Sequence, residues 1–421
     1  MFFAKNNKNN RFIMGVADIF AFNGTDDMAV IGNVSGTVNV GDIVSIINFG
    51  DDNAQMFSAE ICGIETNNNK ADSVTDSFAE LRIKSGNGYN LKTGTVIYSG
   101  NYEMQDMYNN YAVAFMAQMD VVGLKEQTLR NASLSECAEI VRTDHLLVKR
   151  KNIQRTNAEL QKQSSIINGI IREKLYDSDY IYCVYCRSTG EPYMKSDVYK
   201  NGDRLSTAPP VLILITEAFL PFAELKYPSE FYELRKILNG KEKNGIEKFL
   251  GFGFYVNGAA GVSLLYDDVV IPAHTFISQE EHTKKYPLPL PVANPEIQAL
   301  SLLINQIGQP KNDDENTILK FCCKLIVNRM SEVVVLVPVS SDDKKNETEG
   351  PDIPVVKTGD NRYAVPVFTD AVHLLSFFGD KYDAIANKIS LFTDKYDIFI
   401  NPSDKNPNGC YFSKEMIEQL K

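Results

Sequence analysis

Short apolar runs separated by turn residues fill residues 11–100 and restrict what this part of the chain can form. The turn residues are glycine, asparagine and aspartate, as at Asn23-Gly24 and Gly86-Asn87-Gly88. The runs are Phe12 to Phe22, Met28 to Val34, Ile43 to Ile47, Phe57 to Ile64, Phe78 to Ile83 and Thr95 to Tyr98. Many short strands at close spacing are typical of a small barrel or sandwich, and a barrel leaves no exposed strand edge. The sequence therefore predicts an all-β barrel at 1–100.

Apolar residues at three- and four-residue steps follow over 103–176, which is the pattern of one helix face. They begin with Met104, Met107, Tyr108, Tyr111, Phe115, Met119 and Val122. We interpret them as core-packing residues. Ser133-Leu-Ser-Glu136 fits a capping box, in which the serine oxygen accepts from the N3 amide and the glutamate reaches back. These patterns predict a helical connector.

One basic cluster, Lys149-Arg150-Lys151 with Arg155, is the candidate nucleic-acid contact. Few aromatic residues interleave with it to stack bases, so a solvated helix face explains it better. The net charge is −11 at pH 7, and residues 1–100 carry 7 Lys/Arg against 11 Asp/Glu. Because nucleic acids attract an excess of positive charge, nucleic acid is a disfavoured partner and a protein partner is expected.

Two stretches in the C-terminal half carry matching residues at matched spacing: 178–271 and 331–421. Thr216 lies 38 residues after Ser178, and Thr369 lies 38 residues after Ser331. In both stretches an apolar run precedes the threonine and a helical pattern follows it. The match predicts an internal duplication of a mixed α/β module.

A C-x-x-C pair, Cys183 and Cys186, lies in the first of these stretches. Such a pair can be a redox couple or half of a zinc site. Here it falls on a predicted strand over 180–186, and residues three apart on a strand point to opposite faces. A redox pair of the thioredoxin type lies at a helix start instead. We therefore interpret both residues as structural cysteines.

The segment Ala364-Val-Pro-Val-Phe-Thr-Asp370 ends a predicted strand and opens a helix. Its last three residues, with an asparagine that closes a later apolar run, form a candidate ligand or partner site. The candidate residues are Phe368, Thr369, Asp370 and Asn401, with Thr216 and Asn257 in the matching stretch. The alternative is that Thr369 or Asp370 caps the helix and that Asn401-Pro402 makes a turn.

Sequence motifs of catalysis are missing. The only Gly-Lys pair, Gly240-Lys241, is followed by Glu242 and makes no phosphate-binding loop. The four histidines are dispersed without the spacing of zinc ligands. We expect no cofactor, no metal and no catalytic residues. A hydrolase whose two carboxylates lie far apart in the sequence stays open, since such a pair leaves no local pattern.

Seven scattered cysteines do not form the dense framework of a small disulfide-rich domain. The N-terminal sequence MFFAKNNKNNRF lacks the apolar stretch of a secretory signal. The chain also has no apolar stretch near the ~18 residues that span a bilayer. A cytoplasmic location without membrane attachment is the expectation.

The Val-Pro-Val-Phe-Thr-Asp segment is followed by Leu374-Leu-Ser-Phe-Phe378 and by Ile400-Asn-Pro402 before a terminal helix. In these features residues 297–421 resemble the SseB N-terminal domain family, and 166–275 look like a divergent second copy. The resemblance implies an α/β domain without established catalytic chemistry, often in multidomain cytoplasmic proteins.

Residues 12–100 resemble the β-barrel second domain of elongation factor Tu and related translation GTPases. The most specific carrier is Gly-x-x-x-Gly-x-Val-x-x-Gly-Asp, from Gly32 to Asp42. In those factors the barrel contacts RNA and the GTPase domain, and no sequence of a GTPase domain is present here.

The resulting prediction is a multidomain chain of an all-β barrel, a helical connector and two SseB-like α/β modules. The predicted boundaries are 1–100, 101–165, 166–285 and 286–421. The leading functional hypothesis is a non-catalytic interaction or adaptor protein. The alternatives are a translation-associated factor that contacts ribosome or tRNA through the barrel, and the hydrolase with an unrecognised carboxylate site.

Overall fold

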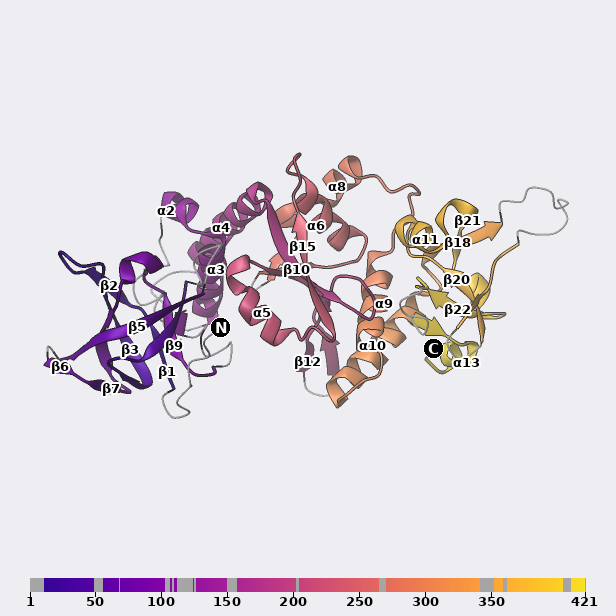
Figure 1. Cartoon of the computed structure of the whole chain (residues 1–421). Coiled ribbons are helices and arrows are strands. Elements are labelled where there is room, and N and C mark those ends of the chain that lie inside the picture. Colours follow the sequence, from indigo (N-terminus) through magenta and orange to yellow (C-terminus); the bar gives the residue numbers. More distant parts are fainter. Residues whose placement is uncertain are drawn as a thin grey trace. The chain divides into compact units, whose positions relative to one another are not determined.

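The chain folds into two compact units (Figure 1). Unit 1 consists of Met1–Leu175 with Ile215–Lys226, and unit 2 of Tyr176–Leu214 with Tyr227–Lys421. The computed structural model describes residues 11–48, 56–67, 69–102, 107, 110–111, 124, 126–149, 157–201, 204–264, 270–340, 352–358, 362–403 and 410–420.

Six antiparallel strands of unit 1 close into a barrel, as the short apolar runs predict. Their order is β1-β9-β4-β5-β8-β3, and β1 pairs with β3 to complete the ring. The six are β1 (Phe12–Gly15), β3 (Met28–Asn39), β4 (Ile43–Ile47), β5 (Met56–Thr66), β8 (Phe78–Ile83) and β9 (Val96–Ser99). Three short strands pair outside the ring: β2 (Asp18–Ala21), β6 (Asn69–Ala71) and β7 (Ser73–Thr75).

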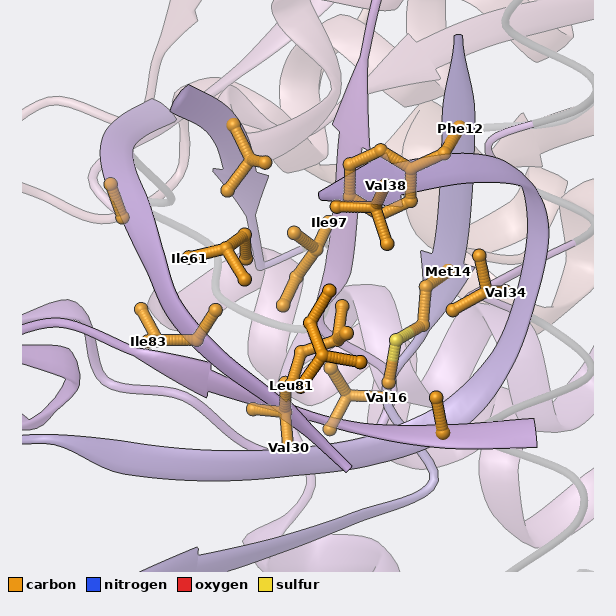
Figure 2. Packing of buried hydrophobic residues seen from close by; sticks show 14 of the residues in the cluster. Phe12, Met14, Val16, Val30, Val34, Val38, Ile61, Leu81, Ile83 and Ile97 are labelled. Carbon is orange, nitrogen blue, oxygen red and sulfur yellow. The ribbon is translucent and has the colours of Figure 1, made fainter. Parts of the chain in front are cut away.

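The barrel core is built by alternation along the strands. In β8, Ala79, Leu81 and Ile83 are buried while the residues between them are partly exposed. Figure 2 shows Leu81 and Ile83 packed with inward-facing residues of other strands, among them Phe12 and Val30. Because side chains alternate across a strand, each strand contributes every second residue to the core.

The glycine-rich stretch from Gly32 to Asp42 has a geometric role in the barrel. Gly36 has φ +91°, and a Cβ there would lie 2.1 Å from the carbonyl oxygen of Arg11 on the neighbouring chain segment. After β3 the chain turns, and Asp42 Oδ2 accepts from the backbone N–H of Asn39 over 2.8 Å. The glycine spacing thus lets β3 approach β1 and turn into β4.

Helices α2 (Glu126–Asn131), α3 (Leu134–Lys149) and α4 (Asn157–Asp177) follow the barrel. The predicted capping box is confirmed at the start of α3. The Glu136 N–H donates to Ser133 Oγ over 3.1 Å, and the Ser133 N–H donates to the Glu136 carboxylate over 2.8 Å. Unit 1 also holds the 3-10 turn Glu217–Phe219 and α5 (Leu220–Lys226).

The described residues of unit 2 form one main β-sheet region in each of its two parts and a separate hairpin. The strand order of the first is β15-β10-β14-β16-β17, with β11 on β14. Its strands are β10 (Tyr180–Cys186), β11 (Met194–Lys195), β14 (Val211–Ile215), β15 (Tyr232–Leu238), β16 (Gly261–Leu264) and β17 (Val270–Pro272). A hairpin of β12 (Val198–Asn201) and β13 (Arg204–Thr207) lies between β11 and β14 in the chain. The helices of this part are α6 (Gly245–Tyr255), α7 (Ala273–Phe276) and α8 (Gln279–Lys285).

The C-terminal part of unit 2 begins with α9 (Pro295–Ile307) and α10 (Asp313–Arg329). Its strands are β18 (Val334–Ser340), β19 (Val356–Lys357), β20 (Tyr363–Val367), β21 (Tyr382–Lys388), β22 (Asp397–Ile400) and β23 (Cys410–Phe412). A bridge between Leu336 and Phe368 joins the β18-β21 pair to the β19-β20-β22-β23 sheet. The remaining helices are α11 (Ala371–Phe378), α12 (Ser390–Thr393) and α13 (Lys414–Leu420).

The two sheets of unit 2 share four pairings with the same directions. β10 and β15 pair antiparallel, as β18 and β21 do. β14 and β16 pair parallel, as β20 and β22 do. The parallel strand then pairs antiparallel with the next strand in both sheets, and β11 pairs with β14 as β19 pairs with β20.

One expected match between the two stretches is wrong. The apolar run that ends in Asn257 lies in helix α6, whereas the run that ends in Asn401 is strand β22. The buried residues Ile246, Leu250 and Phe254 recur every four residues, which is a helical period. A short apolar run does not distinguish a strand from a buried helix segment, and the longer window decides for the helix.

Cys183 and Cys186 lie on β10, which has the predicted bounds 180–186. Both are buried free thiols, and burial raises the pKa of Cys183 above its usual range. A buried thiol in apolar surroundings is a poor nucleophile because the thiolate is the reactive form.

Among the described residues, no helix is long and apolar enough to cross a bilayer.

Candidate functional site

A cavity of about 460 Å³ opens in unit 2. Its walls come from α6, α9, α11, the loop between β10 and β11, and the segment after β22. Residues from the part of unit 2 that holds the first sheet and residues from its C-terminal part therefore both line the cavity.

Five hydrogen-bonded side chains form a ring at one wall of the cavity. Some of them line the cavity, and the others are not part of its lining. Asp370 Oδ2 accepts from Thr369 Oγ1 over 2.8 Å and lies 2.7 Å from His373 Nδ1. Asn401 Nδ2 donates to Thr369 Oγ1 over 2.7 Å and to Gln298 Oε1 over 2.5 Å. Gln298 Nε2 lies 2.8 Å from His373 Nε2, which closes the ring.

One backbone group fixes the direction of every hydrogen bond in this ring. The Thr369 N–H can only donate, and it faces Asn401 Oδ1 at 3.0 Å. The Asn401 amide nitrogen therefore faces Gln298 Oε1, and the Gln298 amide nitrogen faces His373. A neutral imidazole then accepts at Nε2 and donates from Nδ1 to Asp370. With the proton on Nδ1, every hydrogen bond of the ring joins one donor to one acceptor.

Asp370 is fully buried and also caps helix α11. Its Oδ1 accepts from the backbone N–H groups of Val372 and His373 over 2.9 and 3.1 Å. Burial works to raise the pKa of Asp370. The hydrogen bond and charge of His373 and the Thr369 hydroxyl outweigh burial and lower this pKa. The carboxylate is thus ionised, paired and withdrawn from the cavity.

His373 lies at the cavity wall, and its side chain is 16% exposed. Burial works to lower its pKa, while the hydrogen bond and charge of Asp370 outweigh burial and raise it. A proton on Nε2 would face the Gln298 N–H, so protonation requires the Gln298 amide to turn over and give up its bond to Asn401. Both nitrogens of His373 are thus engaged within the ring.

The structure brings together four of the predicted site residues and separates the others. Thr369, Asp370 and Asn401 share the ring, and Asn257 lines the cavity from the end of α6. Phe368 packs beneath them, in an apolar cluster with Leu336, Ala371 and Leu374.

Thr216 belongs to unit 1, where its buried hydroxyl lies 3.0 Å from Ser135 Oγ. Its backbone precedes a 3-10 turn, and its side chain makes no capping bond. Lys149 ends helix α3, and its side chain lies outside the described residues, as do Arg150, Lys151 and Arg155. The predicted nucleic-acid contact therefore remains a prediction.

Sequence reasoning missed Gln298, Glu191 and Asn305, which also line the cavity. Gln298 is 2% exposed and follows the buried Ile297 on α9. A buried polar side chain needs a partner, so a glutamine within an apolar helix stripe was the available signal. Nothing in the sequence around Glu191 marks it, because its position depends on the loop after β10.

The charged residues of the cavity lining are few among the described residues. Glu191 is the only acidic residue among its described lining residues, and none of them is a lysine or arginine. Within the described ranges, no group of three or more His, Cys, Asp or Glu side chains could hold a metal ion. Convergent carboxylates, as a hydrolase of the glycosidase type needs, are not brought together in this lining.

No family model and no curated protein matches the chain. Solved structures with partial similarity include the elongation factor SelB of Methanococcus maripaludis bound to a GTP analogue, at 17% identity and TM-score 0.20, covering 23% of this chain and 20% of SelB. The apo form of SelB matches at 11% identity and TM-score 0.20, over 55% of this chain and 38% of SelB. GDP-bound aIF5B from Aeropyrum pernix matches at 9% identity and TM-score 0.19, over 58% of this chain and 59% of aIF5B. At these TM-scores the similarity carries no argument about function.

Proposed function

We propose that this chain is a non-catalytic interaction protein that binds a protein partner through the cavity of unit 2. The observation that carries the proposal is the closed ring of Asp370, Thr369, Asn401, Gln298 and His373. The ring engages the Asp370–His373 pair in hydrogen bonds to neighbouring side chains. A hydrogen-bonded ring beside aromatic and polar lining residues suits binding rather than proton transfer.

The matched pairings of the two sheets of unit 2 support the proposal. We infer that the two sheets are two SseB-like modules that arose by internal duplication. The support is the four shared pairings, with the same directions in both sheets. A duplicated module offers a binding surface at the junction of its two copies, as the cavity does.

A translation-associated role through the barrel is the second candidate. The closed six-stranded ring and the Gly32 to Asp42 stretch favour it. The excess of acidic residues over 1–100 opposes it, because RNA binding draws on positive charge. For either role we propose the cytoplasm as the site of action, in keeping with seven cysteines that are all free.

The test is capture of partners by the full-length tagged chain from the source cell. We expect a stoichiometric protein partner and a 260/280 nm absorbance ratio of protein without nucleic acid. Bound nucleic acid that salt removes would favour the translation role. Recovery of neither a protein nor a nucleic acid would contradict the proposal of an interaction protein.

A further inference from the structure

We propose that the cavity of unit 2 recognises a guanidinium group, presented as an arginine side chain by the protein partner. This inference rests on the proposed function and names the chemical group that the cavity selects. Three features of the described lining support it: one carboxylate without a hydrogen bond or ion pair, a set of aromatic rings and an amide oxygen without a hydrogen-bond partner.

Glu191 supplies the charge. No hydrogen bond or ion pair to its carboxylate is found among the described residues, although the charges of Arg235 and His373 act on it, and no lysine or arginine lines the described cavity. His373 contributes no competing donor, because both of its nitrogens are engaged in the ring. The nearby Arg235 is already paired with Glu233 over 2.9 Å. The cavity is therefore complementary to a cation.

The backbone around Glu191 is held in place before any ligand arrives. The Glu191 N–H donates to Thr189 Oγ1 over 3.1 Å, and the Glu191 carbonyl accepts from the Cys186 N–H over 2.9 Å. The Gly190 N–H also donates to the Cys186 carbonyl over 2.8 Å. A fixed loop lowers the entropy that binding must overcome.

Aromatic rings are part of the described cavity lining: Tyr185, Phe249, Phe252 and Phe377. Tyr185 and Phe249 stack with centroids 6.5 Å apart. Tyr185 already carries the Arg235 guanidinium 4.1 Å from its ring centroid. Aromatic faces attract cations, and the planar guanidinium stacks on them better than an ammonium does.

Asn305 provides the third feature. Its Oδ1 is buried and has no hydrogen-bond partner, and Asn305 lines the cavity from α9. A buried acceptor without a donor is destabilising. A guanidinium has five N–H donors and no acceptor, which is complementary both to a carboxylate and to an amide oxygen without a donor.

Calorimetry with peptides of matched shape tests the inference. The probes are N-acetyl-Gly-Arg-Gly-amide, the same peptide with citrulline, which is neutral and nearly isosteric, and free arginine. We expect the arginine peptide to bind at least 10-fold more tightly than the citrulline peptide, because only the guanidinium carries a charge that strengthens its hydrogen bonds to a carboxylate. Tighter binding of free arginine than of the peptide would show a metabolite site and overturn recognition of a protein partner.

Glu191→Gln is the diagnostic variant and Glu230→Gln the matched control, since Glu230 is an exposed acid that lines a different pocket. We expect Glu191→Gln to weaken binding of the arginine peptide at least 10-fold and to keep the wild-type unfolding temperature. Glu230→Gln should change neither the affinity nor the unfolding temperature. Equal affinity for arginine and citrulline, no binding, or an unaffected Glu191→Gln variant would overturn the inference. Capture of the same protein partner by wild type and Glu191→Gln would leave the proposed function standing and reject only the guanidinium.

Discussion

The backbone N–H of Thr369 donates to Oδ1 of Asn401 over 3.0 Å, between segments 32 residues apart. This single bond sets the orientation of the Asn401 amide and, through Gln298, of the imidazole of His373. Asn401 can accept it because its backbone has φ +45°, a left-handed conformation that asparagine tolerates better than most residues. The polar wall of the cavity therefore depends on the short turn after β22.

Replacement of Asn401 tests that dependence. Asn401→Gly keeps the backbone conformation and removes the amide, which leaves the Thr369 N–H and Gln298 Oε1 without partners. We expect a loss of about 2 kcal/mol in the free energy of unfolding. Asn401→Ala adds the strain of a left-handed alanine, about 1 kcal/mol more. Urea unfolding followed by tyrosine fluorescence measures both, and equal stability of the two variants would contradict the role given to the backbone.

The charge of Asp370 predicts a pH dependence. Its pKa is lowered in the folded protein from an ordinary value of 3.8. The stability that the carboxylate contributes is therefore present above this value and is lost as the pH falls through the lower, folded pKa. Asp370→Asn should destabilise the protein at pH 7 by about 2 kcal/mol.

Acid titration of unfolding compares this variant with Asp394→Asn, which changes an exposed aspartate. The difference in the free energy of unfolding between wild type and Asp370→Asn should decrease below about pH 4. The stability of Asp394→Asn should follow that of wild type at every pH. A difference that stays constant down to pH 2 would show that Asp370 is not held ionised by its partners.

Gln298→Glu should remove the amide N–H group that faces Nε2 of His373 and opposes its protonation. A carboxylate at this position accepts from Asn401 Nδ2 and from a protonated His373 Nε2 at once. We expect the pKa of His373 to rise by roughly 1 unit or more, since an opposite charge at hydrogen-bond distance shifts a pKa by 1–3 units. Histidine NMR titration measures it, with His274 of the same unit as an internal reference, and an unchanged His373 pKa would refute the ring orientation.

Much of the fold could be read from local sequence. The bounds of β4, β8 and β10 agree with the predicted runs, because each alternates or is uniformly apolar and ends at turn residues. The closure of the barrel through β1 and β3 could be expected only from the number of strands, since pairing is a long-range property. The apolar run that ends in Asn257 was matched to the run that ends in Asn401, which is a strand, because so few apolar residues show no clear period.

The candidate site could be read only in part. Thr369, Asp370 and Asn401 stand where strands end, so their sequence positions marked them. Gln298 bonds to Asn401 across 103 residues, and no local pattern links the two. The cavity itself arises from tertiary packing of α6, α9 and α11.

Two glycines separate backbone strain from close packing in the barrel. Gly41 has φ +88° with no atom within 4 Å of an added Cβ, whereas Gly36 has φ +91° and the Arg11 carbonyl oxygen at 2.1 Å. We expect Gly41→Ala to cost about 1 kcal/mol and Gly36→Ala about 3 kcal/mol or more, because the strands must also move apart. Thermal unfolding measures both, and similar losses would contradict the close approach of β1 and β3.

The most direct test of partner binding at the cavity is photo-crosslinking from two neighbouring positions on α11. Ser376 is exposed and lines the cavity, while Leu375 is 37% exposed and is not part of the lining. With p-benzoylphenylalanine at each position in turn, irradiation in source-cell lysate should give a covalent protein adduct from position 376 and little from 375. Equal adducts at both positions, or none at 376, would contradict an interaction protein that binds through this cavity.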